Sequence, residues 1–172
     1  MLRFTAYRHP EHDEFLRTAF REAFPGYLPQ EMDRCIALLR AGMLRCTLPC
    51  REELPVGFII YKEYPAFFYC EYIAIAAAHR GRRYSTLLLQ HVMEQKDKQW
   101  VFEVETTHQY NLRAPRIKLF KDCGCTEDRF RYDMPRVEQI HPGTRYNLWS
   151  RYPMNEEEFR EVYDTLRSDP DF

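Results

Sequence analysis

The sequence has little glycine, no excess of charge of either sign and no long apolar run, and each shortage excludes a class of protein. Six glycines and 11 prolines among 172 residues exclude a collagen-like or low-complexity chain. The 25 Lys and Arg balance 26 Asp and Glu, which argues against a dedicated nucleic-acid binder. The longest apolar run, residues 72–78, is too short to cross a bilayer.

Residues 1–15 also lack the apolar core of a secretory signal, so we expect a cytoplasmic protein with reduced thiols. The six cysteines include Cys46 and Cys50, and Cys123 and Cys125, but these pairs do not combine into the C-x-x-C arrangement of a zinc site. The six histidines show no H-x-x-x-H spacing. We therefore expect no metal site.

What is present suits one folded domain, because 45% of the residues are hydrophobic and 15% are aromatic. Apolar spacing and capping residues predict helices at residues 11–24, 30–42, 82–98, 113–124 and 155–167. Runs rich in β-branched and aromatic residues predict strands at residues 2–7, 43–48, 55–63, 66–76, 100–106, 128–134 and 144–150.

Three successive strands between residues 43 and 76 are joined by short turns and predict an antiparallel meander. The order of elements predicts an α/β fold with a mixed, mostly antiparallel central sheet flanked by helices. We expect one domain over residues 1–172, with residues 151–172 as a C-terminal helical extension. Asn155 is the expected N-cap of that last helix.

The most informative stretch is a strand, a short loop and a helix at residues 69–89. The loop contains Arg80, Arg82 and Arg83, and Ser85 and Thr86 stand in the first helical turn. A helix N-terminus presents unpaired N–H groups to anions, and arginine binds phosphate oxygens in a bidentate manner. On the loop alone, a phosphate site and an ordinary connection with solvated arginines explain the pattern equally well.

At this point the chain resembles the GCN5-related N-acetyltransferases, the GNAT superfamily. Arg80-Gly81-Arg82-Arg83-Tyr84-Ser85 occupies the family motif [QR]-x-x-G-x-[GA], and Ile73-Ala74-Ile75 fits the strand before it. Residues 116–125 resemble the family's A-I-x-L-Y-x-x-x-G-F segment, and the order of elements matches over residues 2–150. The resemblance implies a GNAT-like fold and transfer of an acetyl group from acetyl-CoA to a primary amine.

The resemblance also implies which residues bind the co-substrate. The backbone of the strand would hold the pantetheine arm and the thioester carbonyl, the loop would hold the diphosphate, and the later helix would complete the site. The residues so implied are Ile73, Ala74, Ile75, Arg80, Gly81, Arg82, Arg83, Tyr84, Ser85, Thr86, Arg113, Arg116 and Phe120.

The chain departs from the family pattern at several of these positions. Arg83 stands where the family has a glycine, which allows a positive φ or a close approach to diphosphate. Ser85 replaces the second small residue, and Arg113 replaces the usual asparagine. Phe120 replaces the tyrosine that often protonates the leaving thiolate, and phenylalanine has no proton to give.

Carboxylates in otherwise apolar strands are the candidate general bases. Glu71 lies on the strand that enters the loop, and strict alternation places it on one face with Ile73 and Ile75. Glu103 and Glu105 alternate on the next strand, and we take Glu105 as the second candidate. The alternative for each is a structural carboxylate paired with an arginine or facing solvent.

Two main functions stay open at this stage, and a third, a nucleic-acid-binding domain, would require salt-dependent binding of RNA. One is N-acetylation of a small molecule or peptide, without nucleic acid or membrane as partner. The other is a catalytically degenerate module that binds acyl-CoA or a protein partner without turnover, which Arg83 and Phe120 favour. The acceptor and the oligomeric state, a homodimer included, are not indicated by the sequence.

Overall fold

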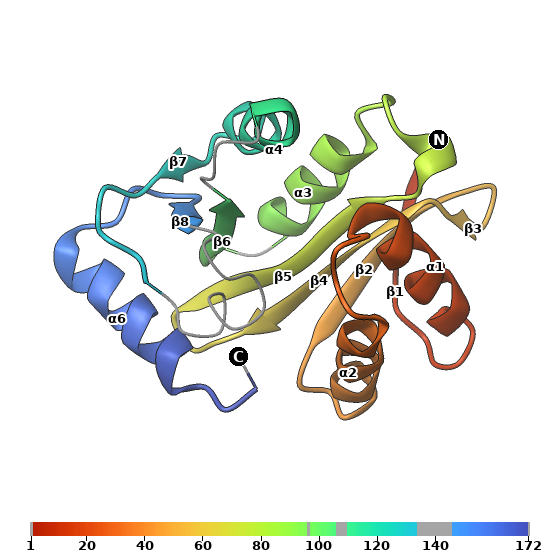
Figure 1. Cartoon of the computed structure of the whole chain (residues 1–172), viewed down its shortest axis with the longest axis horizontal. Coiled ribbons are helices and arrows are strands. Elements are labelled where there is room, and N and C mark those ends of the chain that lie inside the picture. The colour runs from red at the N-terminus through yellow and green to blue at the C-terminus, as the bar shows by residue number, and fades with distance from the viewer. Residues whose placement is uncertain (1, 96, 106–109, 134–145, 172) are drawn as a thin grey trace. The chain divides into compact units, whose positions relative to one another are not determined.

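The structure is a computed structural model that describes residues 2–95, 97–105, 110–133 and 146–171 (Figure 1). It confirms the α/β class, and every strand pairing described below is antiparallel. The chain divides into two compact units, residues 1–98 and residues 99–172. Each unit is treated below by itself, and the expectation of a single domain over residues 1–172 stays a prediction.

The strands of the first unit are β1 (Arg3–Ala6), β2 (Arg45–Arg51), β3 (Leu54–Pro55), β4 (Gly57–Glu63) and β5 (Phe67–Ile75). β1 pairs with β2, β2 with β4, and β4 with β5, so the predicted meander is confirmed. The short β3 was not predicted; it pairs with β2 through a two-residue turn. Both turn residues, Glu52 and Glu53, have positive φ, as the right-handed twist of a tight hairpin requires.

The helices of the first unit are α1 (Asp13–Ala23), α2 (Pro29–Arg40) and α3 (Tyr84–Glu94), with a short 3₁₀ turn η1 (Ala77–His79). α1 and α2 bury apolar residues against one face of the strands, in a core that includes Phe58 and Ile60 of β4 and Tyr72 and Ala74 of β5. The buried residues of α3 lie outside that core, and α3 contacts β2, β4 and β5 from the other face.

The second unit contains β6 (Gln99–Glu105), α4 (Tyr110–Asp122), β7 (Thr126–Glu127), β8 (Tyr146–Ser150) and α6 (Glu156–Ser168). β8 pairs with β6 on one edge and with β7 on the other. Trp100 and Trp149 are fully or almost fully buried there. Asn155 caps α6 in a reciprocal capping box with Glu158, which confirms the predicted N-cap.

The strand predicted at residues 128–134 is wrong over residues 128–133, the part that the structure describes. Side chains hold much of this segment in place of a strand ladder. The Asp128 carboxylate accepts a hydrogen bond from the Met154 N–H, and the Tyr132 hydroxyl donates to Glu103. The alternating polar and aromatic residues of this segment therefore make side-chain contacts and do not form a strand. Among the described residues, no helix is long and apolar enough to cross a membrane.

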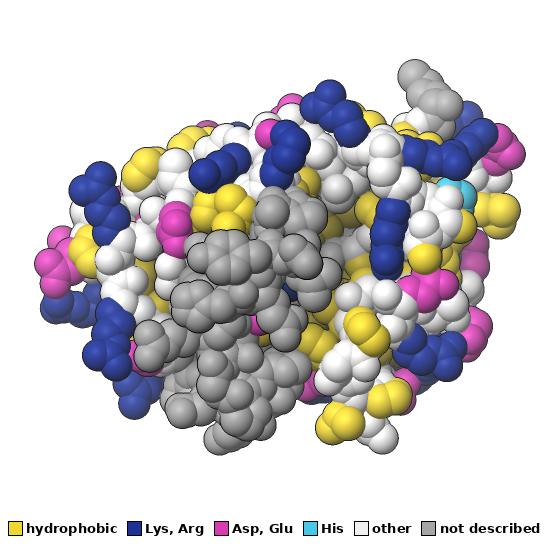
Figure 2. Space-filling view, turned by 45° about the horizontal axis from the view of Figure 1, so that its top comes forward, with side chains coloured by type: hydrophobic (Ala, Val, Ile, Leu, Met, Phe, Trp, Pro, Cys, Tyr) yellow, Lys and Arg dark blue, Asp and Glu magenta, His cyan; other side chains and the backbone are white. Residues whose placement is uncertain are grey.

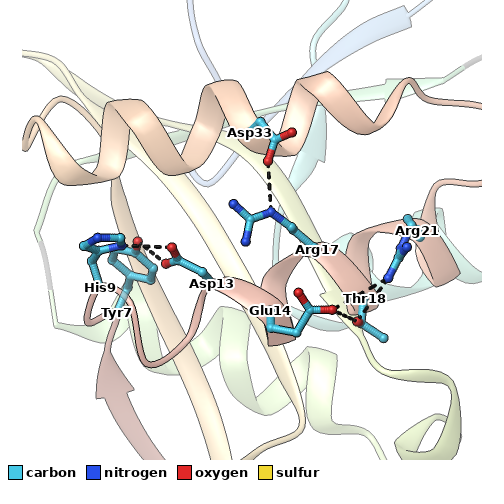
Figure 3. A network of polar contacts seen from close by, with 8 residues as sticks. All are labelled: Tyr7, His9, Asp13, Glu14, Arg17, Thr18, Arg21 and Asp33. Atoms are coloured by element: carbon cyan, nitrogen blue, oxygen red, sulfur yellow. Dashed lines mark hydrogen bonds and ion pairs between the residues drawn. The ribbon is translucent and has the colours of Figure 1, made fainter.

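The carboxylate of Asp13, at the first position of α1, contacts two polar side chains of the segment that leads into the helix (Figure 3). The Tyr7 hydroxyl donates to Asp13 Oδ1 at 2.6 Å, and His9 Nδ1 lies 2.9 Å from Asp13 Oδ2. Burial, together with this hydrogen bond to a carboxylate, raises the pKa of Tyr7. The contacts join the end of β1 to the start of α1.

We expect Asp13→Ala to lower the free energy of unfolding by about 2 kcal/mol, because the substitution leaves the half-buried Tyr7 hydroxyl without its partner. Asp13→Asn should cost less, since an amide oxygen still accepts from Tyr7. Chemical denaturation measures both, with Glu14→Ala at the neighbouring exposed position as the control. Equal effects of Asp13→Ala and Glu14→Ala would contradict the structural role given to Asp13.

Candidate functional site

The loop between β5 and α3 makes its turn with two residues in the left-handed region. Gly81 has φ +77° and Arg83 has φ +60°, and Arg83 is the N-cap residue of α3. The family pattern has glycine at the position of Arg83, and the positive φ explains why: a side chain there costs about 1–2 kcal/mol. Arg83 therefore adopts the backbone conformation of the motif in spite of its side chain.

This turn presents the N-terminus of α3 together with two exposed arginines. The first intrahelical bond runs from Leu87 N to Arg83 O, so the peptide N–H groups ahead of it point out of the helix end. The positive end of the helix dipole and the guanidinium groups of Arg82 and Arg83 favour an anion at this point. Of the implied co-substrate residues, Arg82, Arg83, Tyr84, Ser85 and Thr86 are thus brought together at one helix end.

Arg80 differs from Arg82 and Arg83, because its guanidinium donates hydrogen bonds to main-chain carbonyls. Arg80 Nε donates to the Ile75 carbonyl at 3.0 Å, and Nη2 donates to the Glu22 carbonyl at 3.2 Å. In return, Glu22 Oε2 accepts the N–H of Ala77 at 2.9 Å. The sequence did not indicate Glu22, because its partners lie more than 50 residues further along the chain and no motif links them.

The backbone of Ile73, Ala74 and Ile75 pairs with β4, and a glycine stands at the end of this pairing. Gly57 lies opposite Ile75, and a Cβ at Gly57 would meet Ile75 Cδ1 at 2.5 Å and the Ala74 carbonyl at 2.6 Å. Only glycine therefore fits at position 57. The missing side chain lets the end of β5 lie tight against β4 just before the loop begins.

Glu71 lies at a β-bulge, and this changes which face its side chain takes. Ile60 pairs with Tyr72 and Tyr61 with Cys70, so Glu71 has no Cα partner on β4. The predicted shared face with Ile73 and Ile75 is wrong. Because the extra residue interrupts the alternation, the Glu71 carboxylate lies on the same side as Tyr72, the side that α1 and α2 cover.

On that side Glu71 meets Arg34 of α2. Arg34 Nη2 lies 3.6 Å from Glu71 Oε2, and Arg34 Nε donates to Glu31 Oε2 at 3.1 Å. The Glu71 side chain is only 5% exposed. Burial lowers the pKa of Arg34, but the charges of Glu71 and Glu31 outweigh burial and raise it overall. One guanidinium thus faces two carboxylates, which leaves the group with net negative charge.

Next to Glu71 lies a cluster of four aromatic rings, hereafter the aromatic cluster: Phe20, Phe24, Tyr27 and Tyr72. The centroid of the Tyr72 ring lies 5.1–5.9 Å from those of the other three, with the ring planes steeply inclined. Phe24 and Tyr27 come from the segment between α1 and α2 and are half-buried. The aromatic cluster therefore connects the core of the first unit to the surface beside the bulge.

In the second unit, Glu103 and Glu105 lie on one face of β6, and Phe102 and Val104 on the other. Glu103 accepts a hydrogen bond from Tyr132, and Glu105 is half-buried opposite Tyr146 of β8. Glu71 belongs to the first unit and Glu105 to the second, so the position of each is described only within its own unit.

Phe120 of α4 is buried at 5% exposure in an aromatic core. Its ring centroid lies 4.8 Å from that of Phe102 and 6.1 Å from that of Trp149. This placement favours a packing role over the expected contact with a co-substrate. Arg116, on the same helix, is exposed, whereas the side chain of Arg113 lies outside the described residues.

Other features of the structure offer less chemistry. A pocket of about 110 Å³ lies between α1 and α2 near Phe20 and Met32. Its charged groups are already paired, with Arg17 Nε 2.9 Å from Asp33 Oδ1 (Figure 3). Among the described side chains on the face in Figure 2, basic and acidic groups are interspersed and form no continuous basic surface.

Metal and thiol chemistry find little support in the described part of the chain. No group of three or more His, Cys, Asp or Glu there could hold a metal ion. Burial raises the pKa of Cys46, and it raises that of Cys125 to about 12. These two thiols are poor nucleophiles, because little thiolate forms at neutral pH.

Comparison with known protein families identifies the same family as the one whose motif the loop resembles. The family model described as the acetyltransferase (GNAT) family matches residues 10–125, about two thirds of the chain. No curated protein matches the sequence.

Solved structures share the fold at low sequence identity. One is a structure described as a GNAT-family acetyltransferase from Bacteroides thetaiotaomicron, with a TM-score of 0.77 and 22% identity over 96% of both chains. Another is Arabidopsis thaliana NAA60 in complex with acetyl-CoA, with a TM-score of 0.64 and 16% identity over 87% of this chain and 97% of that one. An aminoglycoside 6'-N-acetyltransferase complexed with coenzyme A has a TM-score of 0.64 and 11% identity over 90% and 99%.

We expect Arg83→Gly to raise the free energy of unfolding by about 0.5–1 kcal/mol. Glycine removes the strain at φ +60°, and this gain exceeds the extra chain entropy that glycine adds to the unfolded state. Arg82→Gly is the matched control: Arg82 has no positive φ, so glycine there should lower stability. Chemical denaturation compares the two, and a loss of stability in both variants would contradict strain at Arg83.

Phe120→Tyr should lower the free energy of unfolding by about 1–3 kcal/mol, because the hydroxyl enters an aromatic core where it finds no partner. Phe130→Tyr is the control, since Phe130 is half-buried and a hydroxyl there can reach water. Thermal and chemical denaturation measure both variants. Unchanged stability of Phe120→Tyr would mean that the ring borders an open or polar space.

Proposed function

The chain belongs to the GNAT family of acetyltransferases, and on that premise we propose that it transfers the acetyl group of acetyl-CoA directly to a primary amine. The observation that carries the proposal is the left-handed turn at Gly81 and Arg83, which presents the N-terminus of α3 with Arg82 and Arg83 beside it. The structures with coenzyme A or acetyl-CoA bound support the choice of co-substrate.

We assign three parts of the chain to acetyl-CoA. The helix end and the two arginines fit the diphosphate, because N–H groups and guanidinium groups both bind phosphate oxygens. The backbone of Ile73–Ile75 is assigned to the pantetheine arm and the thioester carbonyl. Arg116 is exposed on α4 and remains a proposed contact, whereas Phe120, buried in the core, is left out of the proposal.

Glu71 is the general base that we propose. The acceptor ammonium gives up one proton to Glu71, directly or through a water molecule, and the neutral amine then attacks the thioester carbon. The carbon–sulfur bond breaks, the nitrogen loses its second proton to water, and the thiolate leaves and takes a proton from water. A thiolate is a weak base, so an acid in the place of Phe120 is not required. Glu105 remains the second candidate for the base.

The acceptor side of the proposal is the surface beside Glu71, where the half-buried rings of Phe24 and Tyr27 meet the net negative group of Arg34 and its two carboxylates. Aromatic faces and negative charge both favour a cationic amine. The acceptor is therefore proposed as a small molecule or peptide with an amino group. We also propose that the protein acts in the cytoplasm.

The second candidate function is a module that binds acyl-CoA or a protein partner without turnover. The burial of Phe120 among aromatic rings favours it, because the chain then lacks the acid that the family often uses. Titration calorimetry with acetyl-CoA, followed by a thiol-release assay over a panel of amines, separates the two functions. Binding with turnover supports transfer, binding alone supports the acyl-CoA-binding module, and no binding overturns both of these and leaves only a module for a protein partner.

We expect Glu71→Gln to lower kcat for thiol release by about 100-fold while the Kd for acetyl-CoA stays unchanged. Glu31→Gln is the matched control, since it removes the other carboxylate that pairs with Arg34 and should raise KM for the amine without a comparable loss of kcat. If Glu71 served only as a partner of Arg34, the two substitutions would have similar effects. A similar loss in both variants would therefore remove Glu71 as the base and leave Glu105 to be tested.

A further inference from the structure

Two contacts tie the last turn of α1 to the segment that leads into the loop, and a third lies within that segment. Arg80 donates to the carbonyls of Ile75 and Glu22, and the Glu22 carboxylate accepts the N–H of Ala77. We call these three contacts the Glu22–Arg80 brace. They join residues 55 and 58 positions apart in the sequence. The brace therefore fixes the end of β5, the 3₁₀ turn η1 and the end of α1 relative to one another.

The brace ends where the strained part of the loop begins. Arg80 is followed by Gly81 and Arg83, whose left-handed conformations set the direction of the N-terminus of α3. A non-glycine residue with positive φ persists only where its surroundings hold it in place. On the far side, α3 is held by its buried residues Leu88 and Leu89. On the near side, the Glu22–Arg80 brace supplies the corresponding anchor.

The direction of the Arg80 guanidinium separates it from Arg82 and Arg83. Two of its nitrogens already donate to carbonyl oxygens at 3.0 and 3.2 Å, and those carbonyls lie at the end of β5 and the end of α1. A guanidinium so placed orders the backbone around it. All three arginines are exposed, so the two bonds of the Arg80 guanidinium distinguish it, and Arg82 and Arg83 carry the charge that an anion at the helix end would meet.

We propose that Glu22 and Arg80 are positioning residues, which hold the 80–86 segment in its acetyl-CoA-binding conformation without contacting the diphosphate. This inference rests on the proposed function, in which that segment binds acetyl-CoA. It assigns Arg80, a member of the family motif, a role different from that of Arg82 and Arg83. It also adds Glu22, which lies on a different helix and outside the motif.

Titration calorimetry with acetyl-CoA at low and high salt tests the proposal. We expect Glu22→Ala and Arg80→Ala each to weaken binding about tenfold, with the salt dependence of the unmodified protein. Glu22→Ala keeps the Glu22 carbonyl and removes only the Ala77 contact, whereas Arg80→Ala removes the other two contacts, so the double variant should bind more weakly than either single one. Arg82→Ala and Arg83→Ala should instead flatten the salt dependence, since they remove charge that salt screens.

Conservative variants and a neighbour complete the experiment. Glu22→Gln should bind within about twofold of the unmodified protein, because its amide oxygen still accepts the Ala77 N–H. Arg80→Lys should behave like Arg80→Ala, since one ammonium cannot reproduce the two bonds of the guanidinium. Arg21→Ala, at the exposed position next to Glu22, is the control for changes on α1 and should bind normally.

The proposal is overturned if Arg80→Ala flattens the salt dependence, or if Glu22→Ala binds as tightly as the unmodified protein. Hydrogen exchange of the Ala77 amide adds a readout that needs no ligand: protection should be lost in Glu22→Ala and retained in Glu22→Gln. Binding of acetyl-CoA to the unmodified protein distinguishes a failure of the proposed function from a failure of the positioning role. If it fails to bind acetyl-CoA, the proposed function fails; if it binds while the variants behave otherwise, only the positioning role fails.

Discussion

β4 and β5 pair antiparallel over seven Cα pairs, with one shift of register between Ile60 and Tyr61. That shift turns Glu71 toward Arg34 and leaves Tyr72 against the aromatic cluster. The same pairing ends at Gly57 and Ile75, where the close fit of the two strands sets the point from which the loop departs. The proposed base and the proposed binding segment therefore both take their positions from one strand pair.

Much of the fold could be predicted from the sequence, because local preferences and packing agree there. The apolar spacing of α1, the proline at the start of α2 and the capping residue of α6 each determine an element on their own. The segment at residues 128–133 is different, since its alternating pattern matches a strand while side-chain hydrogen bonds decide its structure.

The candidate site could be predicted where it follows a local motif, and it could not where it depends on distant contacts. Residues 80–86 were identified from the arginines at a helix start and from their resemblance to the family motif, and the positive φ of Arg83 agrees with the glycine of that motif. The orientation of Glu71 depends on a register shift, and the direction of the Arg80 guanidinium depends on Glu22. Neither could be predicted, because no sequence motif near Glu71 or Arg80 indicates these contacts. Phe120 fits both a core and a cleft by spacing alone; its contacts with Phe102 and Trp149 favour the core.

The distribution of the two tryptophans has an optical consequence. Trp100 and Trp149 both belong to the second unit, whereas the rings of the aromatic cluster are phenylalanine and tyrosine. Emission excited selectively from indole therefore reports on residues 99–172 alone, whereas tyrosine-weighted near-ultraviolet dichroism reports on both units, because seven of the 12 tyrosines lie in residues 1–98 and five in residues 99–172. Recording both through one denaturant titration would separate the melting of the two units without any label, and coincident curves would identify a single cooperative transition.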